Sequence, residues 1–166
     1  YTDPLNSIIS ANENESTSIM QNVYSKDIDE NLVAERVKEI KERSSICAVS
    51  VTPANTKRLS PIAIEAGADI IVVQSTVTTP RHFSKSITGL NMSDLKKQIK
   101  IPLIVGNCVS YNVALEFMNT GVDGILVGVG PGAACTTREV TGLGVPQVTA
   151  TIDCSLARDT YFKETG

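Results

Sequence analysis

The feature that most constrains the fold is a fourfold alternation of short apolar runs with amphipathic segments. The runs begin near residues 46, 69, 102 and 124, about 20 to 35 residues apart. Continuous apolar runs of this length are typical of strands buried on both faces of a parallel sheet. The intervening segments carry apolar residues at helical spacing, as in Leu32, Val33, Val37 and Ile40 after the candidate N-cap Asp29. Strands alternating with helices predict an α/β protein with a parallel sheet.

The individual elements follow from these periods and from the glycines and caps between them. We expect a polar lead-in over residues 1–29, strands at 46–51, 69–73, 102–106 and 124–128, and helices at 29–40, 56–66, 93–99, 111–120 and 147–163. Ser110 is the expected cap of the fourth helix. Periodicity alone leaves two architectures open, an open doubly wound sheet and a (β/α)8 barrel. A barrel needs about 250 residues, so this chain would be a central portion of about four to five βα units, truncated at both ends.

Composition excludes several classes of protein. The net charge of −3 gives no basic surface for nucleic acid or an anionic membrane, and no apolar run approaches a membrane span. Four widely spaced cysteines without a CxxC pair, with His82 as the only histidine, argue against a zinc site and fit a reducing compartment. We expect a cytoplasmic protein with no nucleic-acid or membrane partner, Cys47, Cys108 and Cys154 as structural thiols, and His82 in an exposed loop.

The loops after the strands are the candidate site, because working residues of parallel α/β folds lie at the carboxyl ends of strands. These loops begin at Thr52, Gln74, Asn107 and Gly128. The last reads Gly128-Val-Gly-Pro-Gly-Ala-Ala-Cys-Thr-Thr-Arg138, and Gly128, Gly130 and Gly132 permit positive φ. The spacing is not GxGxxG, so a Rossmann phosphate loop is disfavoured.

Cys135 stands out within this glycine-rich loop. A cysteine is more often a buried inert thiol, but hydroxyl groups and a guanidinium beside it favour the thiolate. Thr136, Thr137 and Arg138 supply both. The pattern therefore makes Cys135 the candidate nucleophile.

The stretch Asn119–Gln147 that contains this loop closely resembles the active-site loop of the IMP dehydrogenase/GMP reductase family. The resemblance extends from about Tyr24 to Gly166. It is closest to the IMP dehydrogenase-related branch of actinobacteria and cyanobacteria, through the phrases Leu32–Ile40 and Ile64–Ile70. That branch lacks the regulatory CBS pair, and no CBS domain is visible here. The resemblance implies a (β/α)8 TIM barrel, with residues 1–166 forming a partial catalytic barrel domain.

The resemblance also implies a reaction, the NAD-dependent oxidation of IMP to XMP. Cys135 would attack C2 of the purine, hydride would pass to NAD, and water would hydrolyse the covalent thioimidate. Thr137 matches the threonine near the reacting centre, and the carbonyls of Gly130, Gly132 and Cys135 match the positions that hold potassium. A homotetramer is implied for the full-length protein, whereas the fragment alone is expected to be inactive.

Substrate and cofactor positions are carried over in the same way. Asn107, Gly130, Gly132 and Ala133 would bind the substrate; the cofactor would contact Gln74, Ser75, Thr76 and Asn107. Two positions depart from the family pattern. Ala133 replaces the usual phosphate-binding serine, and Gln74 stands where an acidic residue normally holds the nicotinamide ribose.

Two alternative functions remain open. GMP reductases share Cys-Thr-Thr-Arg, although the tail Glu139–Pro146 fits the dehydrogenase better. Because of Ala133 and Gln74, a non-catalytic paralogue that binds purine nucleotides is the second alternative.

Overall fold

The computed structural model describes residues 2–43, 45–82 and 89–166, which divide into two compact units with the boundary after Asn31. The first unit contains α1 (Thr2–Ser10) and α2 (Glu13–Tyr24), which contact each other. The predicted polar lead-in is largely exposed, and it contains two helices that the sequence analysis did not predict. Asn12 starts α2, because its side chain accepts hydrogen bonds from the amides of Asn14 and Glu15.

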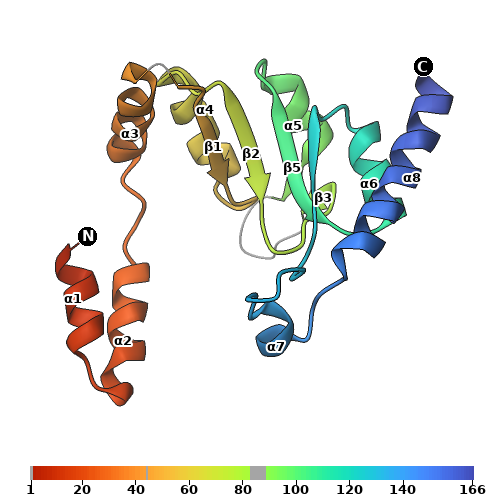
Figure 1. Cartoon of the computed structure of the whole chain (residues 1–166). Coiled ribbons are helices and arrows are strands. Elements are labelled where there is room, and N and C mark those ends of the chain that lie inside the picture. The colour runs from red at the N-terminus through yellow and green to blue at the C-terminus, as the bar shows by residue number, and fades with distance from the viewer. Residues whose placement is uncertain (1, 44, 83–88) are drawn as a thin grey trace. The chain divides into compact units, whose positions relative to one another are not determined.

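The second unit is built on a four-stranded parallel sheet in the order β1 (Ala48–Val51), β2 (Ile70–Gln74), β5 (Leu103–Cys108), β6 (Gly124–Val127). Figure 1 shows these strands side by side. The predicted α/β class and parallel sheet are confirmed. Val51 pairs with Val73, Val73 with Val105, and Gly106 with Leu126, so the carboxyl ends of all four strands reach the same edge.

Three helices connect successive strands of the sheet: α4 (Thr56–Glu65), α5 (Met92–Gln98) and α6 (Tyr111–Asn119). The helix α3 (Glu30–Glu42) precedes β1, and α8 (Gln147–Thr165) follows β6 and packs against α6. Asp29 is the predicted cap of α3, since its side chain accepts from the amide of Asn31 at 3.0 Å. Ser110 is the N-cap residue of α6 but makes no capping side-chain hydrogen bond. The core includes fully buried residues of the two central strands and of α6: Ile71, Val73, Leu103, Val105, Ala114 and Phe117.

Two predicted loops contain further structure. The loop after β2 forms the antiparallel pair β3 (Arg81–His82) and β4 (Leu90–Asn91), so the backbone of His82 lies in a short strand rather than a loop. The glycine-rich loop contains the helix α7 (Thr137–Thr141), which ends at Gly142 in the left-handed region. Neither was predicted, because elements of two to five residues leave no periodic pattern.

The amino-terminal edge of the sheet is braced by two aspartates in equivalent helix-to-strand corners. The carboxylate of Asp69 accepts from the amide of Cys47 at 2.7 Å and pairs with Lys41. Asp123 accepts from the amide of Leu103 at 2.7 Å and pairs with a lysine of α5. The corners Glu65–Asp69 and Asn119–Asp123 therefore share the same arrangement, an aspartate that accepts from a strand amide and pairs with a lysine.

The remaining sequence expectations concern thiols and membranes. Cys47, Cys108 and Cys154 are buried free thiols, as predicted, while Cys135 is half-buried. Among the described residues, no helix is long and apolar enough to span a membrane.

Candidate active site

One cavity of about 440 Å³, a volume ordinary for a small-molecule site, lies at the carboxyl edge of the sheet. Its lining comes from the ends of β1, β2 and β5 and from the glycine-rich loop: Ser50, Val51, Thr52, Gln74, Ser75, Thr76, Asn107, Gly128, Val129, Gly130, Pro131 and Thr137. The structure thus brings together predicted residues of three separate loops, Gln74, Ser75, Thr76, Asn107, Gly130 and Thr137, whereas the predicted residues Gly132, Ala133 and Cys135 are not part of this lining. Thr52 was expected as a loop start, but no pattern in the sequence singled out Ser50.

Backbone pairing between β2 and β5 continues beyond β2 and fixes the cavity wall. The amide of Asn107 donates to the carbonyl of Ser75 at 3.1 Å, and the amide of Thr78 donates to the carbonyl of Asn107 at 3.0 Å. The hydroxyl of Ser75 donates to the carbonyl of Val77 and lies 2.7 Å from the hydroxyl of Thr78. Ser75 therefore lines the cavity with its hydroxyl already engaged, whereas Gln74 and Thr76 are exposed there.

Asn107 links this wall to the glycine-rich loop. Its Nδ2 donates to the carbonyl of Gly128 at 2.9 Å. Its Oδ1 is buried and has no hydrogen-bond partner among the described residues. Buried polar atoms normally have a hydrogen-bond partner, so this oxygen can accept a hydrogen bond from a donor group of a ligand. This buried acceptor is the reason why the cavity fits a polar cofactor or substrate.

The glycines open the loop in two different ways. Gly128 and Gly130 have φ of +132° and +57°, a region that side chains rarely adopt. A Cβ at Gly128 would also lie 2.6 Å from Oε1 of Gln147. Gly132 permits positive φ as well but does not adopt it. Residues 132–135 form a turn, in which the amide of Cys135 donates to the carbonyl of Gly132 at 3.2 Å.

Cys135 lies beside Thr137 at the start of α7. Its Sγ donates to the Thr137 hydroxyl across 3.3 Å. When the sulfur is ionised, the hydroxyl and backbone amide of Thr137 can donate to it instead. These two hydrogen bonds, followed by the nearby charge of Arg138, hold the pKa of the Cys135 thiol below its ordinary value. A partly exposed thiol with a lowered pKa has the properties of a nucleophile.

One of the three carbonyls predicted to bind potassium, that of Gly132, already accepts hydrogen bonds in this loop conformation. The Gly132 carbonyl accepts from the Cys135 amide and, at 3.5 Å, from Nη2 of Arg138. A cation at Gly132 must therefore displace at least the guanidinium. Ala133 is exposed and has no hydroxyl, so any anion at this point of the loop must be held by backbone amides.

Gln147 is a site residue that the sequence did not reveal. It begins α8, and its Nε2 donates to the carbonyl of Val127, the last residue of β6, at 3.2 Å. The amide of Val145 donates to the carbonyl of Val129 at 3.0 Å. The outgoing and returning arms of the loop are therefore tied together. The only feature of the sequence that could have indicated this role is the amide side chain of Gln147 directly after Pro146.

A four-stranded parallel βα sheet with a partly exposed thiol at its carboxyl edge is the arrangement of an α/β protein whose candidate site contains a cysteine loop. The model of the IMP dehydrogenase / GMP reductase domain matches residues 10–163. The chain therefore belongs to the IMP dehydrogenase/GMP reductase family.

Individual relatives agree with this assignment. An uncharacterized oxidoreductase of Mycolicibacterium smegmatis is 32% identical over 149 residues, which cover 89% of this chain and 40% of that protein. The inosine-5'-monophosphate dehydrogenase of Cryptosporidium parvum is 42% identical over 94 residues, 57% of this chain and 22% of that enzyme. The crystal structure of an IMP dehydrogenase/GMP reductase-like protein from Corynebacterium glutamicum matches with a TM-score of 0.83 at 32% identity, covering 99% of this chain and 43% of that one. This chain thus spans about two-fifths of the length of the Mycolicibacterium and Corynebacterium proteins, and its sheet is consistent with part of a TIM barrel.

Proposed function

We propose that the full-length protein is an IMP dehydrogenase that oxidises IMP to XMP with NAD through a covalent intermediate on Cys135. The observation that carries the proposal is the Cys135 thiol, hydrogen-bonded to Thr137 at the carboxyl edge of the sheet with a lowered pKa. Family membership supplies the reaction class. The proposal includes a cytoplasmic homotetramer.

The chemistry begins at the sulfur. The Cys135 thiolate adds to C2 of the purine; NAD, when bound, accepts the hydride that leaves C2. Water then attacks the thioimidate carbon, XMP is released, and the thiol is restored. Covalent attachment splits one difficult step into two easier ones. Thr137 stabilises the thiolate before attack, because its hydroxyl and amide can both donate to sulfur.

The remaining predicted residues bind and orient. Asn107 holds the loop through the Gly128 carbonyl, and its unpaired Oδ1 is the acceptor available to a ligand. In this proposal the backbone at Gly130, Gly132 and Ala133 contacts IMP. Gln74, Ser75 and Thr76 contact the cofactor, with Gln74 and Thr76 contributing exposed side chains. Potassium binding by the carbonyls of Gly130, Gly132 and Cys135 remains a prediction.

GMP reductase is the second candidate because its loop shares the Cys-Thr-Thr-Arg sequence, here Cys135–Arg138. The discriminating experiment assays the purified full-length protein with IMP plus NAD, and separately with GMP plus NADPH, following absorbance of the reduced cofactor. We expect turnover in the first assay. Turnover of GMP alone would refute the dehydrogenase.

A non-catalytic nucleotide-binding paralogue is favoured by Ala133 and Gln74, which lack the hydroxyl and the charge of the usual family residues. Binding of IMP by calorimetry, with no turnover in either assay, would identify this case. The matched control is Cys135→Ala, which must lose turnover but retain IMP binding if the proposal is correct.

A further inference from the structure

Two amide side chains hold consecutive carbonyl groups at the start of the glycine-rich loop. Nδ2 of Asn107 donates to the carbonyl of Gly128 at 2.9 Å. Nε2 of Gln147 donates to the carbonyl of Val127 at 3.2 Å. Because a carbonyl oxygen can only accept, each contact fixes which end of its amide group faces the loop. The two side-chain oxygens, Oδ1 of Asn107 and Oε1 of Gln147, therefore stay available for other contacts.

The backbone of Gly128 is in contact with both of these side chains. Its carbonyl accepts from Asn107, and its amide donates to the carbonyl of Cys108 at 3.0 Å. A Cβ built on Gly128 would lie 2.6 Å from Oε1 of Gln147. Only a residue without a side chain allows this approach. Gln147 therefore lies directly against the residue whose carbonyl orients the Asn107 amide.

The orientation of Asn107 decides which hydrogen-bonding group the cavity wall offers. Asn107 lines the cavity, and its buried Oδ1 has no partner within the described ranges of the chain. The terminal torsion of an asparagine is broad and roughly two-fold. If the Gly128 carbonyl moved away, half a turn of the amide would place Nδ2 where Oδ1 now lies. The position of Gly128 therefore determines whether the wall offers an acceptor or a donor.

Gln147 is placed by α8 rather than by the loop. It is the first residue of this 19-residue helix, and its Nε2 also donates to the hydroxyl of Thr151 at 3.4 Å. The first turn of α8 is closed by the amide of Ala150, which donates to the carbonyl of Pro146. The side chain of Ala150 is fully buried, and α8 packs against α6. A helix docked on the core thus sets the position of the Gln147 amide.

We propose that Gln147 is a positioning residue that acts through Gly128 to hold the Asn107 amide with its oxygen available, so that the cavity selects a ligand group that donates a hydrogen bond. The inference rests on the proposed function only for its two probes, IMP and NAD. Amide hydrogen exchange tests the arrangement without any ligand. A failure of this proposal is therefore distinguishable from a failure of the IMP dehydrogenase assay.

The experiment compares Gln147→Glu with Gln147→Lys in the full-length protein. Glutamate keeps the length of the side chain but replaces Nε2 by an oxygen that repels the Val127 carbonyl, whereas lysine keeps an N–H donor. Hydrogen–deuterium exchange with mass spectrometry follows the peptides that contain the amides of Gly128 and Val145, which donate to Cys108 and Val129. Exchange should be about tenfold faster in Gln147→Glu and within about threefold of the original rate in Gln147→Lys. Equal exchange rates in the two variants overturn the proposal.

This pair also separates positioning from a merely structural role at the start of α8. A negative charge in the first turn stabilises a helix, and a positive charge destabilises it. Thermal melts should therefore place Gln147→Glu at or above Gln147→Lys, the reverse of the order expected for exchange. Gln147→Met, which has neither donor nor charge, should exchange as fast as Gln147→Glu. An exchange order that follows the melting temperatures would assign Gln147 to helix stability alone.

Ligand binding completes the test, with calorimetry of IMP and of NAD measured separately. Asn107→Ala should weaken one of the two about tenfold, because the buried acceptor is lost. Gln147→Glu should weaken the same ligand about three- to tenfold, and should add no further loss in the Asn107→Ala background. Gln98→Glu, at an exposed position at the end of α5, is the control and should change neither exchange nor binding. Unchanged binding of both ligands by Asn107→Ala, or an equal loss from Gln147→Glu in both backgrounds, would overturn the proposal.

Discussion

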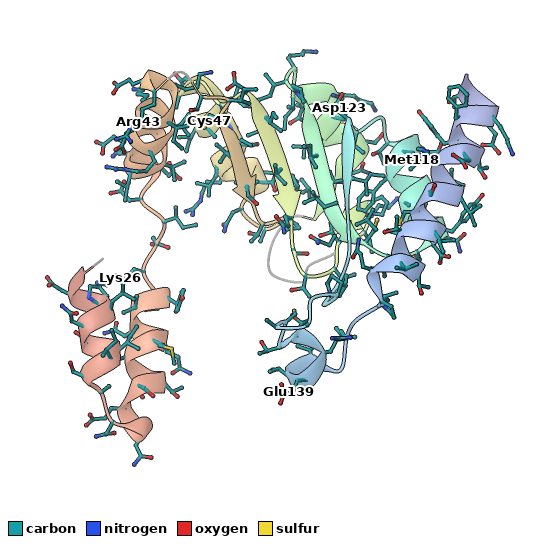
Figure 2. All side chains as sticks on the ribbon, viewed as in Figure 1. Lys26, Arg43, Cys47, Met118, Asp123 and Glu139 are labelled. Carbon is teal, nitrogen blue, oxygen red and sulfur yellow. The ribbon has the colours of Figure 1, made fainter. Side chains whose placement is uncertain are left out.

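The polar side chains at the two edges of the parallel sheet differ in how completely they are hydrogen-bonded and buried. At the amino-terminal edge, Asp69 and Asp123 each accept a backbone amide and pair with a lysine. At the carboxyl edge, the buried Oδ1 of Asn107 has no hydrogen-bond partner in the described part of the chain, and Cys135 is partly exposed. Figure 2 shows Cys47 and Asp123 at one end of the sheet and Glu139, on α7, at the other.

The amino-terminal edge of the sheet thus contributes to stability, and the carboxyl edge carries the candidate chemistry. Satisfied polar groups stabilise the chain, whereas an unpaired buried acceptor costs free energy unless a ligand supplies a donor. In (β/α) barrels the carboxyl edge is where substrates bind. We therefore expect changes at the carboxyl edge to alter reactivity with little effect on melting, and changes at the amino edge to do the reverse.

The largest expected effect tests the carboxyl edge. Cys135→Ala should lower turnover of IMP by the full-length protein at least about 10³-fold, because alanine cannot form the covalent intermediate. The melting temperature should change by no more than about 2 °C, since the side chain is only half-buried. Steady-state rates and differential scanning calorimetry check the two parts. Unchanged turnover would exclude covalent catalysis through this loop.

The next effect compares thiols within the same folded chain. Iodoacetamide at pH 8 should modify Cys135 at least about 100 times faster than Cys108 or Cys47. Burial, with the neighbouring Cys154, raises the pKa of Cys108 to about 12, so it is almost entirely protonated at pH 8. Cys47 is only 1% exposed. Peptide mass spectrometry over time measures the ratio of the alkylation rates. Comparable rates for Cys108 and Cys135 would show that the two thiols do not differ in reactivity.

A smaller effect tests the link between the strand end and the loop. Asn107→Asp keeps the shape but replaces the donor to the Gly128 carbonyl with a charged oxygen that repels it. Turnover should fall about tenfold. Asn112→Asp, on the exposed side of α6, is the control and should leave turnover unchanged. Equal rates for the two variants would show that the Asn107 contact does not position the loop.

The sequence predicted the sheet because each strand forms a continuous apolar run, and burial on both faces requires that run. It also predicted which loops converge, since parallel strands end at one edge; Gln74, Asn107 and Thr137 do line one cavity. The helices α1 and α2 were missed because their apolar residues are sparse among serine and asparagine.

What could not be predicted depends on contacts between distant segments. The engagement of the Ser75 hydroxyl and the contact from Gln147 to β6 follow from the folded paths of the segments after β2 and β6. Local periodicity contains no information about those paths. Gly132 illustrates the limit, because glycine permits positive φ without requiring it.

The smallest expected effect tests the amino-terminal edge through its pH dependence. Hydrogen bonds from Lys41 and from the Cys47 amide lower the pKa of Asp69, and Lys96 and the Leu103 amide lower that of Asp123. A carboxyl group whose pKa is lower in the folded state stabilises the fold above its ordinary pKa of about 4, and loses that contribution as the pH falls through the folded value. Asp123→Asn and Asp69→Asn should therefore each lower the melting temperature by a few degrees at pH 7. The difference from the original protein should shrink progressively below pH 4.

Circular dichroism melts at pH 7 and pH 3 measure this difference, with Asp27→Asn, at an exposed position between α2 and α3, as the control. Alkylation of Cys135 by iodoacetamide should proceed at the original rate in both aspartate variants, because the changes lie at the opposite end of the sheet. A melting difference that persists at pH 3 would assign the aspartates' effect to packing rather than charge. A slower reaction of Cys135 in either variant would show that the two ends are coupled, and the separation of stability from chemistry would then fail.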